Sequence, residues 1–333
     1  MNWLWSRRAK APPDAPAPMV ERWKVDGESV LGVSHERKGL PNQDCILWWS
    51  SPDESVVVMA VADGHGSARC MRSDRGSKCA VQAAVDVLQR FVNWYMETPG
   101  TASTDSVSLS SARRRAEEML PSEIHRQWMQ AVGEELQREP LTPAEVEAAR
   151  GERSSPDARV SLMAYGTTLL AVAICPDYML CLQLGDGDIL VVLDDGSVSC
   201  PVPGDERLIA NETTSLCSPN APRDFRCFFQ VLSGEPPALV LLSTDGYSNS
   251  FSDDKAFEQV GSDILAMLRA QGPDYVRTNL HEWLTAASRE GSGDDISLGL
   301  IYRVSALSQP ETSAIGTSPE PPVPEDSARG DTP

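Results

Sequence analysis

The chain has 333 residues, and 29 Lys and Arg against 48 Asp and Glu give it a formal net charge of −19. An apolar content of 41% is enough for a large buried core and excludes a wholly disordered chain. The acidic balance argues against nucleic acid as a partner, because the phosphate backbone would repel it. No apolar run approaches the roughly 20 residues that a membrane-spanning helix needs, so we also expect no membrane association.

The eight cysteines are scattered and include no C-x-x-C pair, a pattern typical of reduced thiols in a cytoplasmic protein. The start of the chain lacks the long apolar stretch of a secretory signal, which also favours a cytoplasmic location. Proline-rich segments poor in large apolar residues lie at residues 1–20 and 306–333. We predict two disordered tails there, the second one acidic, around a folded domain at residues 21–305.

Strand and helix patterns follow one another along the domain. Apolar runs predict strands at residues 56–62, 167–174, 178–184, 188–193, 225–232, 238–243 and 296–304. Helical spacing of apolar residues predicts helices at residues 67–96, 112–137, 253–269 and 273–287, with a short helical turn within 142–150. The stretches 97–111 and 139–160 otherwise have the composition of surface loops.

The spacing between most of these strands is too short for a crossover helix, which favours antiparallel pairing. Blocks of strands also alternate with pairs of helices. We therefore predict an α+β fold, in which two mainly antiparallel sheets are sandwiched between helical layers.

The dipeptide Asp-Gly occurs five times, and it usually marks a turn, as we expect for Asp26 and Asp195. Asp63 and Asp245 differ, because each comes at the end of an apolar strand, and Asp294-Asp295 directly precedes the last strand. Carboxylates that converge at strand ends repel each other unless a cation lies between them. Oxygen ligands favour Mg²⁺ or Mn²⁺ over Zn²⁺. His65, two residues after Asp63, could be a ligand or an acid beside the site.

Six short motifs between about residues 28 and 303 together resemble the ordered motifs of the metal-dependent (type 2C) protein serine/threonine phosphatases, most closely a bacterial branch of that family. In chain order they are Gly32-Val-Ser-His35 with Pro41-Asn-Gln-Asp44, Val61-Ala-Asp-Gly-His-Gly66, Tyr165-Gly-Thr-Thr168, Leu184-Gly-Asp-Gly-Asp188, Ser243-Thr-Asp-Gly-Tyr247 and Gly293-Asp-Asp-Ile-Ser297.

The resemblance implies a four-layer α-β-β-α sandwich with a binuclear Mn²⁺ or Mg²⁺ centre between the sheets. It implies that Asp63 bridges both metals and that the Gly64 carbonyl binds one of them. Asp245 and Asp294 would hold the other metal, although Asp295 is the neighbouring alternative to Asp294. Asp44 would position a metal-bound water, and a weaker third metal would use Asp186 and Asn249.

The implied reaction is hydrolysis of phosphoserine or phosphothreonine by a metal-activated water. His65 would act as general acid for the departing alkoxide, because its pKa lies near the working pH. Two features depart from the family pattern. Gly39 stands where many members carry a phosphate-gripping Arg, for which Arg37 or Lys38 would substitute. Gln43 stands where an acidic residue often precedes the Asp.

The partners implied are a phosphoprotein substrate and a cognate Ser/Thr kinase. One alternative is a catalytically weak pseudophosphatase that acts as a phosphoprotein-binding or regulatory adaptor. The missing Arg at Gly39 favours that alternative, whereas the presence of Asp63, Asp245 and Asp294 argues against it. A second alternative is a metal-dependent hydrolase of small phosphate esters, since substrate choice depends on loops.

Overall fold

A computed structural model of the chain describes residues 20–97, 106–150, 161–204, 213–234 and 236–308. The predicted tails fall almost wholly outside these residues. Only Val20 and residues 306–308 of them are described, and the latter belong to a 3-10 helix, Val304–Ser308, rather than to a tail. None of the helices in the described part is both long and apolar enough to span a membrane.

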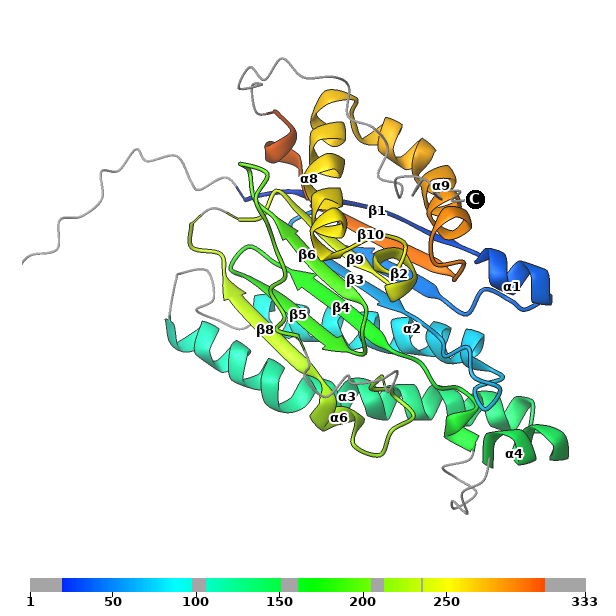
Figure 1. The fold of residues 1–333 in the computed structure, drawn as a ribbon. Helices are drawn as coiled ribbons and strands as arrows, with labels where there is room; N and C mark the ends of the chain where they lie inside the picture. The colour runs from blue at the N-terminus through cyan, green and yellow to red at the C-terminus, as the bar shows by residue number, and fades with distance from the viewer. Residues whose placement is uncertain (1–19, 98–105, 151–160, 205–212, 235, 309–333) are drawn as a thin grey trace, which may run out of the picture.

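Two five-stranded antiparallel sheets form the centre of the fold (Figure 1). The first sheet has the order β1 (Trp23–Val30), β10 (Ile296–Arg303), β9 (Leu239–Ser243), β6 (Asp188–Val192), β7 (Val198–Ser199). The second sheet has the order β2 (Cys45–Ser50), β3 (Val57–Ala62), β4 (Leu169–Ile174), β5 (Tyr178–Leu184), β8 (Arg226–Val231).

Long helices cover the outer face of each sheet (Figure 1). The helices α2 (Ser73–Glu97) and α3 (Ser106–Arg138) lie on the second sheet, and α8 (Asp254–Ala270) and α9 (Pro273–Glu290) lie on the first. Four short helices are also described, α1 (Val33–Lys38), α4 (Pro143–Arg150), α6 (Ala221–Asp224) and α7 (Asp245–Ser248), and residues 161–163 are helical as well. The predicted α+β sandwich of four layers is confirmed.

Strand β3 is apolar at every position, and both of its faces are buried. Val57, Met59 and Val61 face the layer between the two sheets, whereas Val58 and Ala60 belong to the core beneath α2 and α3. Because side chains alternate across a strand, a strand buried on both faces needs apolar residues at every position. The four layers thus enclose three apolar cores, of which the middle one holds the two sheets together.

Several local predictions were wrong. Asp26-Gly27 is not a turn but the middle of β1, where these residues pair with Leu300 and Gly299 of β10. Its sequence lacks an apolar run, and the strand depends instead on backbone pairing and on the Tyr302 hydroxyl, which donates to Asp26 at 2.8 Å. The sequence patterns also missed β2, and residues 106–111 are helical rather than loop.

Candidate metal centre

Three carboxylates converge where the two sheets meet. Asp63 follows β3 of the second sheet, Asp245 follows β9 of the first, and Asp186 lies in the loop between β5 and β6. One oxygen from each lies within 4.8 Å of the others. The sequence placed each residue next to a strand, and the packing of the two sheets brings the strand ends together.

The electrostatics show how closely these groups crowd one another. Burial raises the pKa of Asp63 well above its ordinary value, and the charges of Asp44, Asp245 and Asp294 raise it further. The pKa of Asp245 is raised to about 6, first by burial and then by Asp186 and Asp294. Several ionised carboxylates in one partly buried site repel each other and lose hydration. A bound cation offsets this unfavourable free energy.

Asp44 lies at the inner edge of this group and is 5% exposed. One of its oxygens accepts a hydrogen bond of 2.7 Å from the Thr244 hydroxyl. Its pKa is raised well above the ordinary value, chiefly by burial and then by the charges of Asp295, Asp294 and Asp245. The carboxylate therefore faces the same acidic centre as the predicted ligands.

Asp294 and Asp295 have different roles in the structure. Asp295 is 3% exposed, and its two oxygens accept hydrogen bonds from the amides of Gly32 and Gln43 and from His35 Nδ1, at 2.6, 2.7 and 2.8 Å. The Asp294 side chain is 57% exposed and contributes its charge to Asp63, Asp44 and Asp245. Asp295 organises the loops, which leaves Asp294 as the carboxylate available to a cation.

Gly64 permits a close approach of backbone that any side chain would block. A Cβ there would lie 2.6 Å from the Gln43 carbonyl oxygen and 2.7 Å from that of Ser73. The Gly64 amide donates to the Gln43 carbonyl at 3.1 Å, and Gly64 also forms an isolated β-bridge with Thr167. These contacts fix the direction in which Asp63 leaves the end of β3.

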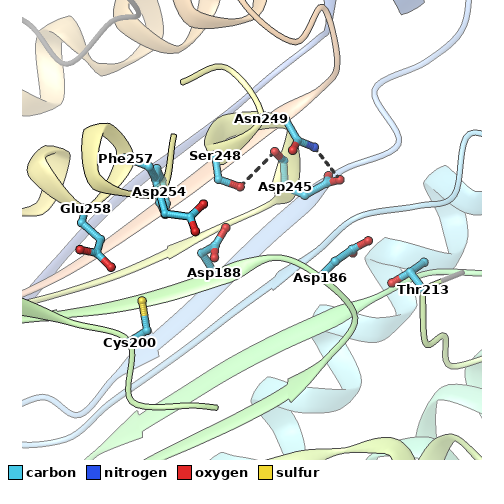
Figure 2. Close-up of a pocket in the computed structure, with 10 residues that line it drawn as sticks. All are labelled: Asp186, Asp188, Cys200, Thr213, Asp245, Ser248, Asn249, Asp254, Phe257 and Glu258. Atoms are coloured by element: carbon cyan, nitrogen blue, oxygen red, sulfur yellow. Dashed lines mark hydrogen bonds between the residues drawn. The ribbon is translucent and has the colours of Figure 1, made fainter. Parts of the chain in front are cut away.

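A cavity of about 490 Å³ opens beside Asp186 and Asp245 (Figure 2). Its ten lining residues include five carboxylates and no basic side chain: Asp186, Asp188, Cys200, Thr213, Asp245, Ser248, Asn249, Asp254, Phe257 and Glu258. The Asn249 amide donates to an Asp245 oxygen at 3.0 Å, so these two predicted ligands are neighbours (Figure 2). Asp188, which the sequence reasoning did not select, has its pKa raised to about 6 mainly by burial.

His65 follows Asp63 by two residues, and its amide donates to the Gly166 carbonyl at 3.1 Å. A Cβ at Gly166 would come within 2.8 Å of the imidazole, so this glycine leaves room for the ring. Burial lowers the pKa of His65, and the charge of Asp186 acts in the opposite direction. The ring is thus held close to the acidic centre.

Arg37 and Lys38, the predicted phosphate-binding residues, are exposed in the last turn of α1. None of the hydrogen bonds or ion pairs described in the structure joins them to the carboxylates above. Gly39 ends the helix with a φ of 66°, a left-handed conformation that disfavours an arginine. The backbone at this position therefore favours glycine over any residue with a side chain.

Two functional features escaped the sequence reasoning. Thr244 was noted only as part of a motif, and His35 only as part of another, yet Thr244 contacts Asp44 and His35 contacts Asp295. Their positions inside the motifs indicated that both residues belong to the site. The contacts themselves could not be predicted from local sequence, because they join residues 200 and 260 positions apart.

The residues present fit a site for hard divalent cations. The oxygens of Asp63, Asp186 and Asp245 lie close enough to share ions, and the cavity beside them carries only negative charge. The fold and this site together define a class of protein, an α-β-β-α sandwich with an acidic centre at the strand ends between its sheets.

Comparisons with known proteins agree with this class. The family described as "Protein phosphatase 2C" matches residues 31–285, so the chain belongs to the protein phosphatase 2C family. It is thus a protein serine/threonine phosphatase, from a family that depends generally on metal ions. Comparison with curated protein sequences gives no match.

Solved structures share the fold at low sequence identity. A bacterial serine phosphatase aligns with a TM-score of 0.52 and 14% identity, over 84% of this chain and 98% of the other. The serine/threonine phosphatase Stp1 from Staphylococcus aureus aligns with a TM-score of 0.52 and 13% identity, over 88% of this chain and 99% of the other.

Proposed function

We propose that this phosphatase hydrolyses phosphoserine and phosphothreonine in protein substrates with two bound Mn²⁺ or Mg²⁺ ions. The observation that carries the proposal is the convergence of Asp63, Asp186 and Asp245 within 4.8 Å, in a chain of this family. A pair of such ions neutralises charge on the phosphoryl oxygens and makes water a better nucleophile at neutral pH.

The chain's own residues would divide the work of holding these ions. Asp63 would serve both ions and the Gly64 carbonyl one of them, while Asp245 and Asp294 would hold the second. A weaker third site would use Asp186, with Asn249 beside it. Asp186 lines the cavity and Asp294 is exposed to solvent, so an incoming ion can reach both carboxylates.

Asp44 would act on the attacking water, and His65 would act on the leaving group. Asp44 is held by Thr244 and would orient the attacking water through a hydrogen bond. His65 would give a proton to the departing serine or threonine oxygen. We retain Arg37 and Lys38 as candidates for phosphate binding, because α1 places both at the surface beside the loops of the centre.

The pseudophosphatase alternative is not favoured, because the chain belongs to the phosphatase family and retains Asp63, Asp245 and Asp294, the carboxylates proposed here to hold the ions. We also propose a cytoplasmic location, supported by eight cysteines that are all free thiols. A Ser/Thr kinase would supply the phosphorylated substrate.

The test is an assay of the purified full-length protein on a phosphothreonine peptide with Mn²⁺, with Mg²⁺ and with EDTA. EDTA should abolish turnover, and Asp63→Asn should lower it by about a hundredfold or more, since a shared metal ligand contributes several kcal/mol to the transition state. Asp195→Asn is the matched control, because Asp195-Gly196 is the same dipeptide in an exposed turn. Turnover that survives EDTA or Asp63→Asn would contradict the proposal.

A further inference from the structure

A second group of potential ligands lies next to the carboxylates, around the buried imidazole of His35. His35 is 7% exposed, and its Nδ1 lies 2.8 Å from an oxygen of Asp295. Its other ring nitrogen, Nε2, lies 3.9 Å from an oxygen of Asp294. One ligand atom from each of His35, Asp294 and Asp295 lies within 4.8 Å of the others.

Asp295 determines which ring nitrogen of His35 carries the hydrogen. Both Asp295 oxygens already accept backbone amides, and the carboxylate is nearly fully buried, so Nδ1 of the imidazole must carry the hydrogen that points at it. In the neutral imidazole this leaves a lone pair on Nε2. A carboxylate that receives Nδ1–H and leaves Nε2 free is the usual support of a metal-ligating histidine.

Gln43 supplies an independent observation. This residue is 7% exposed, and its Oε1 is buried without a hydrogen-bond partner among the described residues. A Cβ built on Gly66 would meet two side-chain atoms, Gln43 Oε1 at 3.6 Å and His35 Nε2 at 3.9 Å. The unpartnered oxygen and the imidazole nitrogen therefore face the same small region, next to a residue that has no side chain.

A buried acceptor without a partner is costly, and each such group in a folded protein calls for an explanation. The three groups that face this region, His35 Nε2, Gln43 Oε1 and the Asp294 carboxylate, are all electron-pair donors. A divalent cation satisfies all three at once, whereas an anion would be repelled by Asp294.

We propose that His35 and Gln43 are ligands, together with Asp294, of a divalent cation at the edge of the acidic centre. This inference rests on the proposed function, because Asp294 is one of the ligands assigned there. Gln43 then replaces the acidic residue of the family pattern by a neutral oxygen, and His35 adds a nitrogen. A site that mixes nitrogen and oxygen ligands should favour Mn²⁺ over Mg²⁺, which prefers oxygen alone.

The experiment uses Mn²⁺ as the probe and the metal-stripped full-length protein. Pulsed electron paramagnetic resonance of bound Mn²⁺ should show coupling to one histidine nitrogen, which changes when histidine is labelled with ¹⁵N. The coupling should vanish in His35→Ala. It should persist in His65→Ala and in His281→Ala, the matched control, since His281 is an exposed side chain on α9.

Affinities give a second readout. His35→Ala should weaken Mn²⁺ binding at one site by roughly tenfold or more and change Mg²⁺ binding much less. Gln43→Glu, which restores a carboxylate, should tighten Mn²⁺ binding. If His35→Ala fails to fold, nitrogen coupling that persists in His65→Ala and His281→Ala, together with the effect of Gln43→Glu, still tests the inference.

Bound Mn²⁺ without nitrogen coupling in an active wild type would overturn the inference and leave the proposed function intact. Nitrogen coupling from His35 in a protein without turnover would support the site and contradict the proposed function. Binding of inorganic phosphate that requires His35 but no metal would identify an anion site and also overturn the inference.

Discussion

The hydroxyl of Thr244 donates a hydrogen bond of 2.7 Å to Asp44 and at the same time accepts one of 2.9 Å from the Ser297 amide. Thr244 follows a strand of the first sheet, and Asp44 precedes a strand of the second. One hydroxyl thus joins the two sheets beside the acidic centre. Because both partners are buried, replacing this hydroxyl leaves two groups unsatisfied.

We expect Thr244→Val to lower the free energy of unfolding by about 2 kcal/mol, because the buried Asp44 oxygen and the Ser297 amide lose their partner. Thr244→Ser keeps the hydroxyl and loses only a buried methyl group, so it should cost about 1 kcal/mol or less. Urea unfolding in the presence of EDTA measures both variants. Equal stability of the valine variant and the wild type would show that the hydroxyl has no role in joining the sheets.

The metal-free protein should become less stable as pH rises, through the contribution of Asp245. Its pKa is raised from 3.8 to about 6 in the folded state, so its stabilising contribution is complete below pH 4 and is lost as pH rises through 6. In EDTA at pH 7.5, Asp245→Asn should therefore be more stable than the wild type, by an amount on the order of 1–3 kcal/mol.

Saturating Mn²⁺ should invert that order, because a bound cation stabilises the ionised carboxylate of the wild type. Thermal unfolding at pH 5 and 7.5, with and without Mn²⁺, measures the effect. Stability curves of the wild type and Asp245→Asn that remain parallel over this pH range would refute the raised pKa of Asp245.

Glu145 of α4 forms a two-point ion pair with Arg72, through contacts of 2.8 and 2.9 Å. Arg72 is 5% exposed and directly precedes α2, close to the loop that carries His65. These contacts attach α4 to the body of the domain. The segment at residues 142–150, which the sequence predicted to be a helical turn, is therefore firmly docked.

We expect Glu145→Gln to cost about 2 kcal/mol at neutral pH, as for a hydrogen bond between charged groups. The Arg72 hydrogen bonds lower the pKa of Glu145 from 4.5 to about 2. The stability difference from the wild type should hold above pH 4.5 and shrink as pH falls toward 2. Glu117→Gln, in an exposed pair with Arg113, is the control and should change stability by less than about 0.5 kcal/mol.

His65→Asn should lower kcat on a phosphothreonine peptide by about 10²- to 10⁴-fold, the usual contribution of a general acid. It should have a much smaller effect on p-nitrophenyl phosphate, because that leaving group departs without a proton. Parallel steady-state assays on both substrates, with Mn²⁺ binding measured separately, provide the test. Equal losses on the two substrates would assign His65 a role other than proton donation.

The sequence predicted strands and helices well, because the spacing of apolar residues that identifies them is a local property of the chain. The apolar run before Asp63 predicted a strand, and β3 begins one residue later than expected. Ala80, Ala83, Ala84, Val87, Leu88 and Phe91 are all buried on α2, as their spacing predicted. Met119 belongs to the apolar spacing of α3 but is 43% exposed, because only the packing partner decides which face of a long helix is covered.

The sequence by itself determined the layered α+β fold and the residue types of the centre, because strand periodicity and motif order are properties of the local chain. Which carboxylate of the pair Asp294-Asp295 faces the centre was decided only by the tertiary structure. Asp295 turns toward amides more than 250 positions away, and no local pattern encodes such contacts. The same long-range packing brings His35 and Gln43 to one point, since burial and hydrogen bonding become defined only when distant loops meet.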